Sequence, residues 1–312
     1  MDVRELRYFV HVAELKSFSK AAIHIRIAQP ALSRQIRKLE EELGVDLLIR
    51  SGRGLELTDS GKRLLRKAYL VLDQMEDMRL SVRSQENRIA GTLTIGVPPA
   101  AGEMLVPPVL IRCGDIYPGL RVDVVEGFSG YLYERLLNHE LSLAIMHNPV
   151  AHRDLEIIPL LVEDMYLIGP AKPKHGLCPV DELACLRGIP LILPNQPHSL
   201  RALVESSMAE HDISINVLRQ VDGLVIIRAM LRAGLGYSVL TYGSVHRDVQ
   251  NGVLSARRLE RPPITWKLCL VRRREANRRE AVDALSEIVI SEVNELASKR
   301  IWRGNPTHPA AN

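Results

Sequence analysis

Along the N-terminal part of the chain, apolar positions recur at helical spacing in three short segments that turn signals separate. The first segment places apolar side chains on one helical face, at Leu6, Phe9, Val10, Ala13 and Leu15. Residues 17–19 interrupt this pattern, and Ser19 is expected to cap a second helix. Residues 27–30 indicate a turn and the start of a third helix, because Pro30 suits the first turn of a helix. The order of these three helical segments and the turns between them predicts a helix-turn-helix.

The third segment carries one apolar stripe and one polar face. Its stripe consists of Leu32, Ile36, Leu39 and Leu43, and Gly44 then supplies the stop signal. The opposite face presents Gln29, Ser33, Arg34, Arg37 and Lys38, side chains that can reach base edges and phosphates from a helix in the major groove. Residues 46–58 follow as two short apolar strands around a glycine-rich loop that contains Arg53. A basic hairpin after three helices predicts a wing. Taken alone, each Arg is more typical of an ordinary solvated face than of a DNA contact.

A long helix is predicted from a cap at residues 58–60 to about Asn87. Apolar residues alternate at spacings of four and three, at Leu64, Ala68, Val71, Met75, Met78 and Val82. This heptad pattern predicts a coiled coil and therefore a dimer. The alternative is a helix that packs on its own domain. Residues 89–91 end the helix and are expected to serve as a hinge.

From Thr92 onward, short apolar strands alternate with helices, which predicts an α/β architecture. The first series has strands at 92–97, 120–125 and 141–146 and helices at 102–113 and 130–138. The second has strands at 166–169, 190–193, 216–221 and 237–240 and helices at 199–210 and 223–233. A strand at 266–271, a helix at 279–299 and a disordered tail at 304–312 complete the prediction.

Positive charge is confined to the first part of the chain. Residues 1–67 hold 14 Lys and Arg against 9 Asp and Glu, whereas the remainder holds 27 against 28. A polyanion partner is therefore expected for the first domain only. The chain has 46% hydrophobic residues, no apolar run long enough to span a membrane and no signal-peptide pattern, so we expect a cytoplasmic protein without membrane contact.

The sequence holds no motif that predicts an enzyme. The patterns GxSxG, HExxH, the P-loop and GxGxxG after a strand are absent, and His147, His198 and Asp222 form no recognisable catalytic set. The four cysteines lack metal-ligand spacing, so neither a metal nor a cofactor is expected. A free-standing solute-binding protein would need export. A structural DNA binder would not need such a long α/β part.

The string SFSKAAIHIRIAQPALSRQIRKLEEELGVDLLIRSGRGLELTDSG resembles the DNA-binding signature of the LysR family of transcriptional regulators. The resemblance covers residues 3–61, with Leu48 where the family usually has Phe and Ile25 where it has Leu. It implies a winged helix-turn-helix in which Gln29, Pro30, Ser33 and Arg34 face the groove and Arg50 and Arg53 lie near the DNA backbone. Arg37 and Lys38 of the same helix face and Ser19 complete the expected DNA contacts. It also implies a homodimer or homotetramer on two half-sites of double-stranded DNA. The further partners that we expect are a small organic metabolite, which would act as the effector, and RNA polymerase.

The family resemblance also implies a two-lobed, periplasmic-binding-protein-like effector domain. The expected domains are 1–58, the linker 59–90 and the effector domain 91–303, with lobe I at 92–165 and 271–300 and lobe II at 166–270. Ligands of open α/β sheets bind beyond the carboxyl ends of the strands. This rule selects Pro99, Ala100, Ser129, Gly130, His147, Asn148, His198, Ser199 and Thr241. Helix N-termini at Gly102, Gly130 and Ser199 are expected to favour an anion.

One departure concerns the effector. Many family members place Ser or Thr directly after the first strand, where a ligand carboxylate is held, whereas residues 98–101 here read Pro-Pro-Ala-Ala. A carboxylate would have to use backbone amides at this point. Each histidine is also as typical of an ordinary core or surface position as of a ligand contact. Residues 124–137 and 191–201 resemble the nitrogen-assimilation-control-like branch of the family.

Overall fold

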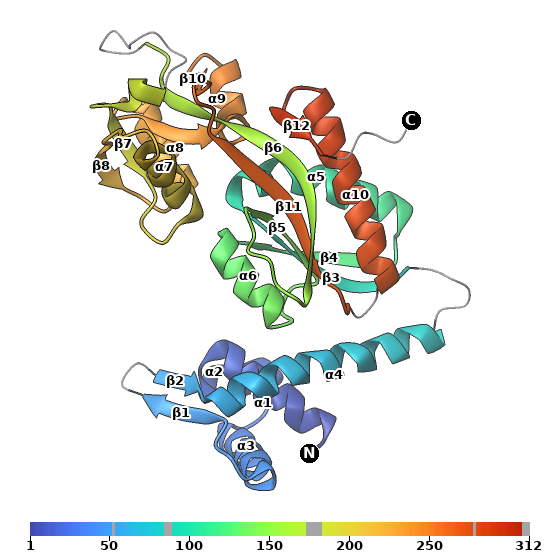
Figure 1. Cartoon of the computed structure of the whole chain (residues 1–312). Coiled ribbons are helices and arrows are strands. Elements are labelled where there is room, and N and C mark those ends of the chain that lie inside the picture. The colour runs from blue at the N-terminus through green and yellow to red at the C-terminus, as the bar shows by residue number, and fades with distance from the viewer. Residues whose placement is uncertain (52–53, 84–88, 173–182, 277–278, 308–312) are drawn as a thin grey trace. The chain divides into compact units, whose positions relative to one another are not determined.

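The computed structural model of the chain describes residues 1–51, 54–83, 89–172, 183–276 and 279–307 (Figure 1). The chain forms two compact units, one made by residues 1–91 and the other by most of residues 92–312. We describe each unit by itself. None of the helices in the described ranges has both the length and the apolar character that a membrane span requires.

The first unit is a helix-turn-helix with a two-stranded wing. Its elements are α1 (Val3–Leu15), α2 (Phe18–Ile25), α3 (Gln29–Leu43), β1 (Leu48–Ser51), β2 (Gly54–Leu57) and α4 (Asp59–Arg83). The predicted cap of the second helix is wrong. Ser17 has the extended conformation of an N-cap and its Oγ accepts from the Lys20 amide at 3.3 Å, whereas Ser19 lies inside α2.

Side chains from all three helices and the wing fill the core of this unit. The fully buried members are Phe9, Val12, Ala21, Ala22, Leu32, Ile36, Leu39 and Leu47. They include the predicted apolar stripe of α3 except Leu43, which is 38% exposed. The small side chains of Ala21 and Ala22 let α2 approach its neighbours closely, as a helix-turn-helix requires.

A polar junction fixes the wing to the helices on either side of it. The Glu40 carboxylate at the end of α3 accepts from the amides of Leu47 and Leu48 at 2.8 and 3.1 Å. The Thr58 hydroxyl accepts from the Gly61 amide at 2.9 Å and so caps α4. A Cβ at Gly61 would lie 2.1 Å from the Leu47 carbonyl oxygen, so only glycine fits here.

The predicted heptad seam of α4 divides into two parts. Its N-terminal part packs on α1 of the same unit, where Ala68 is 1% exposed and contacts Leu6 and Val10, with Leu64 packed alongside. For Ala68, and in part for Leu64, the structure therefore favours the alternative of packing within the same unit. Val71 and Met78 are 44% and 54% exposed. Met75 is half-buried, and the Val82 side chain lies outside the described residues.

The second unit has two α/β lobes that share a long strand (Figure 1). Lobe I contains β3 (Gly91–Val97), α5 (Pro99–Ile116), β4 (Leu120–Glu126), α6 (Ser129–Leu137), β5 (Leu143–His147), β11 (Thr265–Arg273), α10 (Arg279–Ser298) and β12 (Gly304–Pro306). Lobe II contains η1 (Leu183–Leu186), β7 (Pro190–Leu193), α7 (Ser199–Ala209), β8 (Asn216–Gln220), α8 (Leu224–Arg232), β9 (Ser238–Thr241), η2 (Tyr242–Val245), α9 (His246–Gln250) and β10 (Leu254–Arg258).

Strand β6 (Leu155–Pro170) runs through both lobes and sets their boundary. Its first part pairs with β11 up to Asp164, and its last part pairs with β9 and β10 from Met165 onward. The pairing places the return to lobe I slightly earlier than the predicted boundary near residue 270. Because β11 pairs with β5 and with the lobe I part of β6, lobe I resumes at Thr265.

The C-terminal segment is ordered where a disordered tail was predicted. β12 pairs with β6 at Leu161–Glu163, and the Thr307 hydroxyl donates to the Pro159 carbonyl at 2.6 Å. The prediction is wrong for residues 304–307 because strand pairing and the neighbouring buried Trp302, which is 1% exposed, hold the segment. Residues 308–312 lie outside the described part of the chain.

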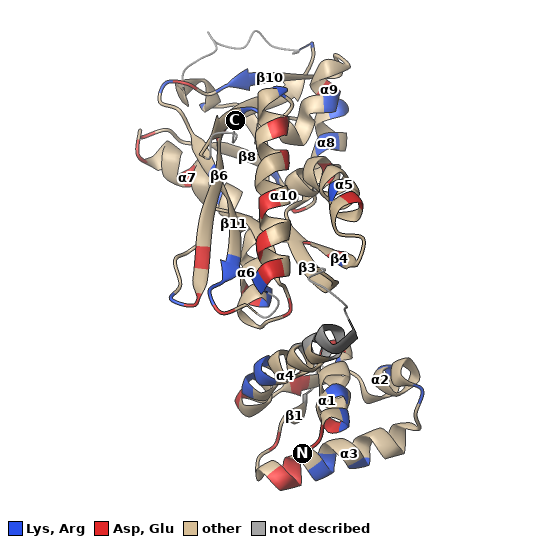
Figure 2. Cartoon of the chain, turned by 90° about the vertical axis from the view of Figure 1, so that its right-hand side faces the viewer, with Lys and Arg blue, Asp and Glu red and all other residues tan. Residues whose placement is uncertain are grey.

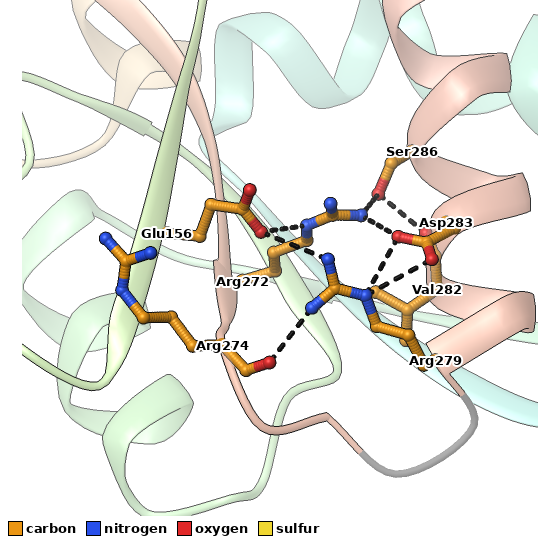
Figure 3. A network of polar contacts seen from close by, with 7 residues as sticks. All are labelled: Glu156, Arg272, Arg274, Arg279, Val282, Asp283 and Ser286. Carbon is orange, nitrogen blue, oxygen red and sulfur yellow. Dashed lines mark hydrogen bonds and ion pairs between the residues drawn. The ribbon is translucent and has the colours of Figure 1, made fainter.

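Lobe I is also fastened by a network of charged side chains at the ends of β11 and α10 (Figure 3). The Arg272 guanidinium donates to Glu156 at 2.8 Å, to Asp283 at 2.5 Å and to the Ser286 hydroxyl at 3.2 Å. Arg279 Nε donates to both carboxylate oxygens of Asp283, each at 3.2 Å. Arg272 is only 8% exposed, so these partners compensate for the desolvation of its charge.

Candidate functional site

The polar face of α3 is the first candidate site. Its apolar stripe is buried in the helical core, which leaves the opposite face to solvent. Pro30, Arg34 and Arg37 are exposed, and Gln29 and Ser33 are half-buried at the same end of the helix. Figure 2 shows Lys and Arg on α3 and again on α4. A helix with this face can enter the major groove and offer both base-reading and phosphate-binding donors.

Lys38 has a partner inside its own unit. Its ammonium donates to the Glu5 carboxylate at 2.9 Å. Glu5 is 2% exposed, and its side chain also completes a capping box with Asp2 at the start of α1. The hydrogen bond from Lys38 holds the pKa of Glu5 below its usual value. Lys38 therefore joins α3 to α1 in addition to any contact with DNA.

The other predicted DNA contacts lie around this face or outside the described residues. Ser19 is exposed on α2. Arg50 lies in β1, opposite Leu55 of β2, but its side chain is outside the described residues, as is all of Arg53.

The second candidate site is a pocket in the effector unit, between elements of lobe I and lobe II. It has a volume of about 60 Å³. Its walls are mainly apolar. They are formed by Pro98, Pro99, Ala100, Phe128, Ser129, His147, Pro194, His198, Ser199, Leu200, Asp222, Leu224, Ile227, Leu240, Thr241, Ser244 and Trp266. Helices α5, α6 and α7 begin here, so the positive ends of their dipoles lie at the pocket.

Seven of the nine predicted effector residues meet in this pocket. They are Pro99, Ala100, Ser129, His147, His198, Ser199 and Thr241. Gly130 instead lines an adjoining hollow formed by α6 and the loop before α7.

The structure gives Asn148 and Gly102 other places. Asn148 is exposed in a left-handed conformation, and its side chain accepts from the Lys267 amide at 3.1 Å, so it joins β5 to β11. The predicted helix N-terminus at Gly102 is wrong. α5 begins at Pro99, and the Gly102 amide already donates to the Pro98 carbonyl at 2.8 Å.

Behind the pocket wall lies a buried chain of polar side chains that the sequence did not reveal. His147 Nε2 lies 2.7 Å from a carboxylate oxygen of Glu163, and the Trp302 indole donates to the other oxygen at 2.6 Å. The His147 ring stacks on Trp266 with 3.7 Å between centroids and 15° between planes. Since His147 and Glu163 are 5% and 1% exposed, each depends on the other for a partner.

His198 is held in one orientation and in its neutral form. It caps α7, since its Nδ1 accepts from the Leu200 amide at 3.1 Å. Phe128 meets the imidazole edge-on, with ring centroids 4.3 Å apart. Desolvation by burial lowers the pKa of His198 from its usual value. A neutral ring that accepts at Nδ1 carries its proton on Nε2.

Two of the lining residues each have an N–H group without a hydrogen-bond partner among the described residues. The two groups are His198 Nε2 and Trp266 Nε1, and both atoms are buried. The lining residues include no Lys or Arg. Their one carboxylate, Asp222, accepts from the amide and the side chain of Asn195, each at 2.8 Å, which lowers its pKa. The described residues also show no cluster of His, Cys, Asp and Glu that suits a metal ion.

Sequence reasoning could not find Glu163, Trp266 or Trp302 as neighbours of the site. Trp266 opens a predicted strand and carries no signal of a ligand contact. Glu163 looks like a solvent-facing residue of a strand, and Trp302 precedes a segment that was expected to be disordered. Their contacts bridge 16 and 139 positions of sequence, and only the folded chain brings them together.

Comparison with known proteins gives matches over both units. The family described as "Bacterial regulatory helix-turn-helix protein, lysR family" matches residues 3–62, and "LysR substrate binding domain" matches residues 86–294. The HTH-type transcriptional regulator BbuR of Bordetella bronchiseptica is 35% identical, over 98% of this chain and 94% of its own. The nitrogen assimilation regulatory protein nac of Escherichia coli is 30% identical, over 97% and 99%. Full-length OxyR from Pseudomonas aeruginosa superposes with a TM-score of 0.75 at 26% identity, over 99% and 98%.

Proposed function

Because the chain belongs to the LysR family and is a DNA-binding transcriptional regulator with an effector-binding domain, we propose a role for each of its two sites. The α3 face reads DNA in the major groove, with Arg34 and Arg37 as its main contacts. The supporting observation is that α3 buries Leu32, Ile36 and Leu39 while its Arg side chains stay exposed. Gln29, Pro30 and Ser33 at the start of α3 complete this face, and Ser19, Arg50 and Arg53 contact the flanking backbone.

We propose that α4 joins two copies of the chain through its exposed apolar residues. Val71 and Met78 face solvent, while the residues that pack on α1 are excluded from this contact. A homodimer places two α3 helices on two half-sites, and pairing of dimers would give a homotetramer. RNA polymerase at the promoter is the remaining partner that we propose.

We propose that a small molecule binds in the pocket between the lobes and changes their arrangement. The supporting observation is that residues from both lobes line the pocket, while β6 connects them. A ligand that binds one arrangement more tightly shifts the population toward it. This shift would alter the spacing of the two DNA-binding units in the oligomer.

The DNA-reading role can be tested with Arg34→Ala and Arg37→Ala in the full-length protein. DNA from upstream of its own gene and unrelated DNA of equal length are titrated at several salt concentrations. If the Arg hydrogen-bonds a base edge, its removal should weaken specific binding roughly 5- to 150-fold. If it binds a phosphate instead, its removal should weaken binding to both DNAs and lower the salt slope by about one.

The matched control is Arg153→Ala, which removes an Arg of the effector unit whose side chain is 90% exposed. It should bind both DNAs as the unmodified protein does. If neither α3 variant differs from this control on either DNA, the assignment of the α3 face is wrong.

A further inference from the structure

Helix η2 belongs to lobe II but contacts both the pocket and lobe I. It directly follows β9, and Thr241 and Ser244 both line the pocket. The Ser244 hydroxyl donates to the Thr241 carbonyl at 2.6 Å, and both residues are buried. The same short helix packs against α5 of lobe I. Part of the pocket wall is therefore also part of the surface where the two lobes meet.

The first polar contact between the lobes at η2 is an ion pair. Arg228 of α8, in lobe II, donates to the Glu103 carboxylate of α5, in lobe I, at 2.8 Å. The same Arg228 nitrogen donates to the Ser244 carbonyl of η2 at 3.3 Å. Arg247 of α9 lies 3.9 Å from the other oxygen of the Glu103 carboxylate. Two cations of lobe II thus attract one carboxylate of lobe I, and one of them is also bound to η2.

The second polar contact comes from the segment that connects α10 with β12. The Arg303 guanidinium lies over the Tyr242 ring of η2, 3.6 Å from the ring centroid. On one side of this contact, Trp302 donates to Glu163 in the lobe I part of β6 at 2.6 Å. On the other side, β12 pairs with the same part of β6 (Figure 1). The C-terminal segment is therefore anchored in lobe I on both sides of its contact with lobe II.

The lobes also approach each other closely at Gly243, which stands between Tyr242 and Ser244 in the sequence. A Cβ at this position would lie 2.4 Å from Met104 Cε of α5 and 3.4 Å from Trp302 Cδ1. The two polar contacts of η2 therefore accompany a region where side chains of lobe I are packed against lobe II.

The two polar contacts are strong enough to bias the arrangement of the lobes and weak enough to be broken. The side chains of Arg228 and Glu103 are 16% and 38% exposed, and Arg303 is exposed. A partly exposed ion pair or cation–π contact changes an equilibrium constant roughly two- to fivefold. Acting independently, the two together favour the described arrangement roughly 5- to 30-fold. A ligand with a larger difference in affinity between two arrangements can overcome this bias.

We propose that the Glu103–Arg228 ion pair and the Arg303–Tyr242 contact form a lock that holds the two lobes in the described arrangement. Because η2 carries both contacts and part of the pocket wall, a ligand that displaces Ser244 releases the lock. The C-terminal segment is thus a strap between the lobes. The coupling of this lock to DNA binding rests on the proposed effector role of the pocket.

The test is acrylamide quenching of Trp302 fluorescence in the ligand-free, full-length protein. The substitution Trp266→Phe leaves Trp302 as the only tryptophan, and Trp302 is 1% exposed, so it can be quenched only when its surroundings open. Arg228→Met and Glu103→Gln each remove the ion pair but leave the Trp302 hydrogen bond in place. If the ion pair holds the lobes together, each should raise the quenching constant roughly two- to fivefold.

The matched control is Arg232→Met, one turn further along α8. Arg232 donates two hydrogen bonds to Asp248, each at 2.9 Å, and both residues belong to lobe II, so this ion pair does not cross between the lobes. The control should leave Trp302 as protected as in the parent protein. Circular dichroism shows that each variant is folded, and Glu103→Gln retains the shape of the side chain that it replaces.

The double variant Arg228→Met/Arg303→Met tests whether the C-terminal segment is part of the lock. With both contacts removed, the quenching constant should rise roughly 5- to 30-fold. If the double variant is quenched no more than Arg228→Met alone, or if both ion-pair variants behave as Arg232→Met does, the inference is overturned.

The affinity of the same variants for DNA from upstream of the gene separates this inference from the proposed function. If Trp302 becomes accessible and DNA affinity differs from that of the Arg232→Met control, both the lock and its coupling to DNA are supported. If Trp302 becomes accessible while DNA affinity equals that of the control, the lock stands and the proposed coupling of the lobes to DNA is wrong.

Discussion

The buried carboxylate of Glu163 allows a quantitative test of the polar chain behind the pocket. Glu163→Met keeps the approximate volume but removes both acceptor oxygens. His147 Nε2 and Trp302 Nε1, which lie 2.7 and 2.6 Å from those oxygens, then lose their partner. An unpaired buried donor costs about 1–3 kcal/mol, so two should reduce the free energy of unfolding by roughly 2–6 kcal/mol.

Two further variants show whether the missing hydrogen bonds cause this loss. Glu163→Gln retains one acceptor for the indole, and its amide can donate to His147 if the imidazole changes tautomer, so it should cost only about 1 kcal/mol. In the double variant Glu163→Met/Trp302→Phe, the unpaired indole N–H is also gone. The double variant should therefore be more stable than the sum of the two single effects predicts, by about 1–3 kcal/mol.

The assay is urea unfolding of the full-length protein at pH 7, followed by tryptophan fluorescence. The chain has 2 tryptophans, Trp266 and Trp302, and both lie in the effector unit, so the signal reports on that unit alone. In the double variant, Trp266 remains as the reporter. If Glu163→Met stays within about 0.5 kcal/mol of the unmodified protein, or if the two substitutions are additive, the chain of contacts does not stabilise the fold as argued.

Three further predictions concern other parts of the molecule. Gly61→Ala should destabilise the DNA-binding unit by about 3 kcal/mol or more, because the added Cβ would lie 2.1 Å from the Leu47 carbonyl oxygen. Thermal melting of the full-length protein measures this loss. A melting transition that is unchanged from that of the unmodified protein would contradict the prediction. Arg272→Met should cost about 1–3 kcal/mol in urea unfolding, because it removes the hydrogen bonds to Glu156, Asp283 and Ser286, while Arg279 still contacts both carboxylates. A change below about 0.5 kcal/mol would show that the network in Figure 3 contributes little. Burial lowers the pKa of His198, so below pH ~6.5 the unfolded chain binds the proton more readily than the folded chain, and stability falls as the pH falls. The stability advantage of the unmodified protein over His198→Asn should thus shrink between pH 7.5 and 5.5, and an advantage that grows would refute this sign.

The DNA-binding unit shows how much local sequence can establish. Each of its signals lies within one or two turns of the residues that it organises: the α3 stripe, Pro30 at the start of α3, Gly44 at its end, and Thr58 before α4. The class of fold therefore followed from the sequence. The error in the α2 cap is small, because Ser17 and Ser19 are both suitable caps and only the backbone conformation distinguishes them.

In the effector unit, the sequence could not predict features that depend on pairing between strands that are distant along the chain. The sequence indicated most strands and helices correctly, since burial produces local apolar runs. It could not place β11 in lobe I or β12 beside β6, because a strand's partner is not encoded in its own residues. Seven of the nine predicted effector residues reached the pocket because strand ends that share a sheet edge lie together.

The amino-acid sequence by itself thus determined the family, the order of units, the polar face of α3 and most of the residues that line the pocket, because these depend on periodicity, local turn chemistry and a dense local motif. Only the tertiary structure decided which side of α4 is already covered by α1, where the lobes divide, and that Trp302 reaches the pocket wall through Glu163. The physical reason is the same in each case. Desolvation forces a buried group to find a partner, and that partner can lie anywhere along the chain.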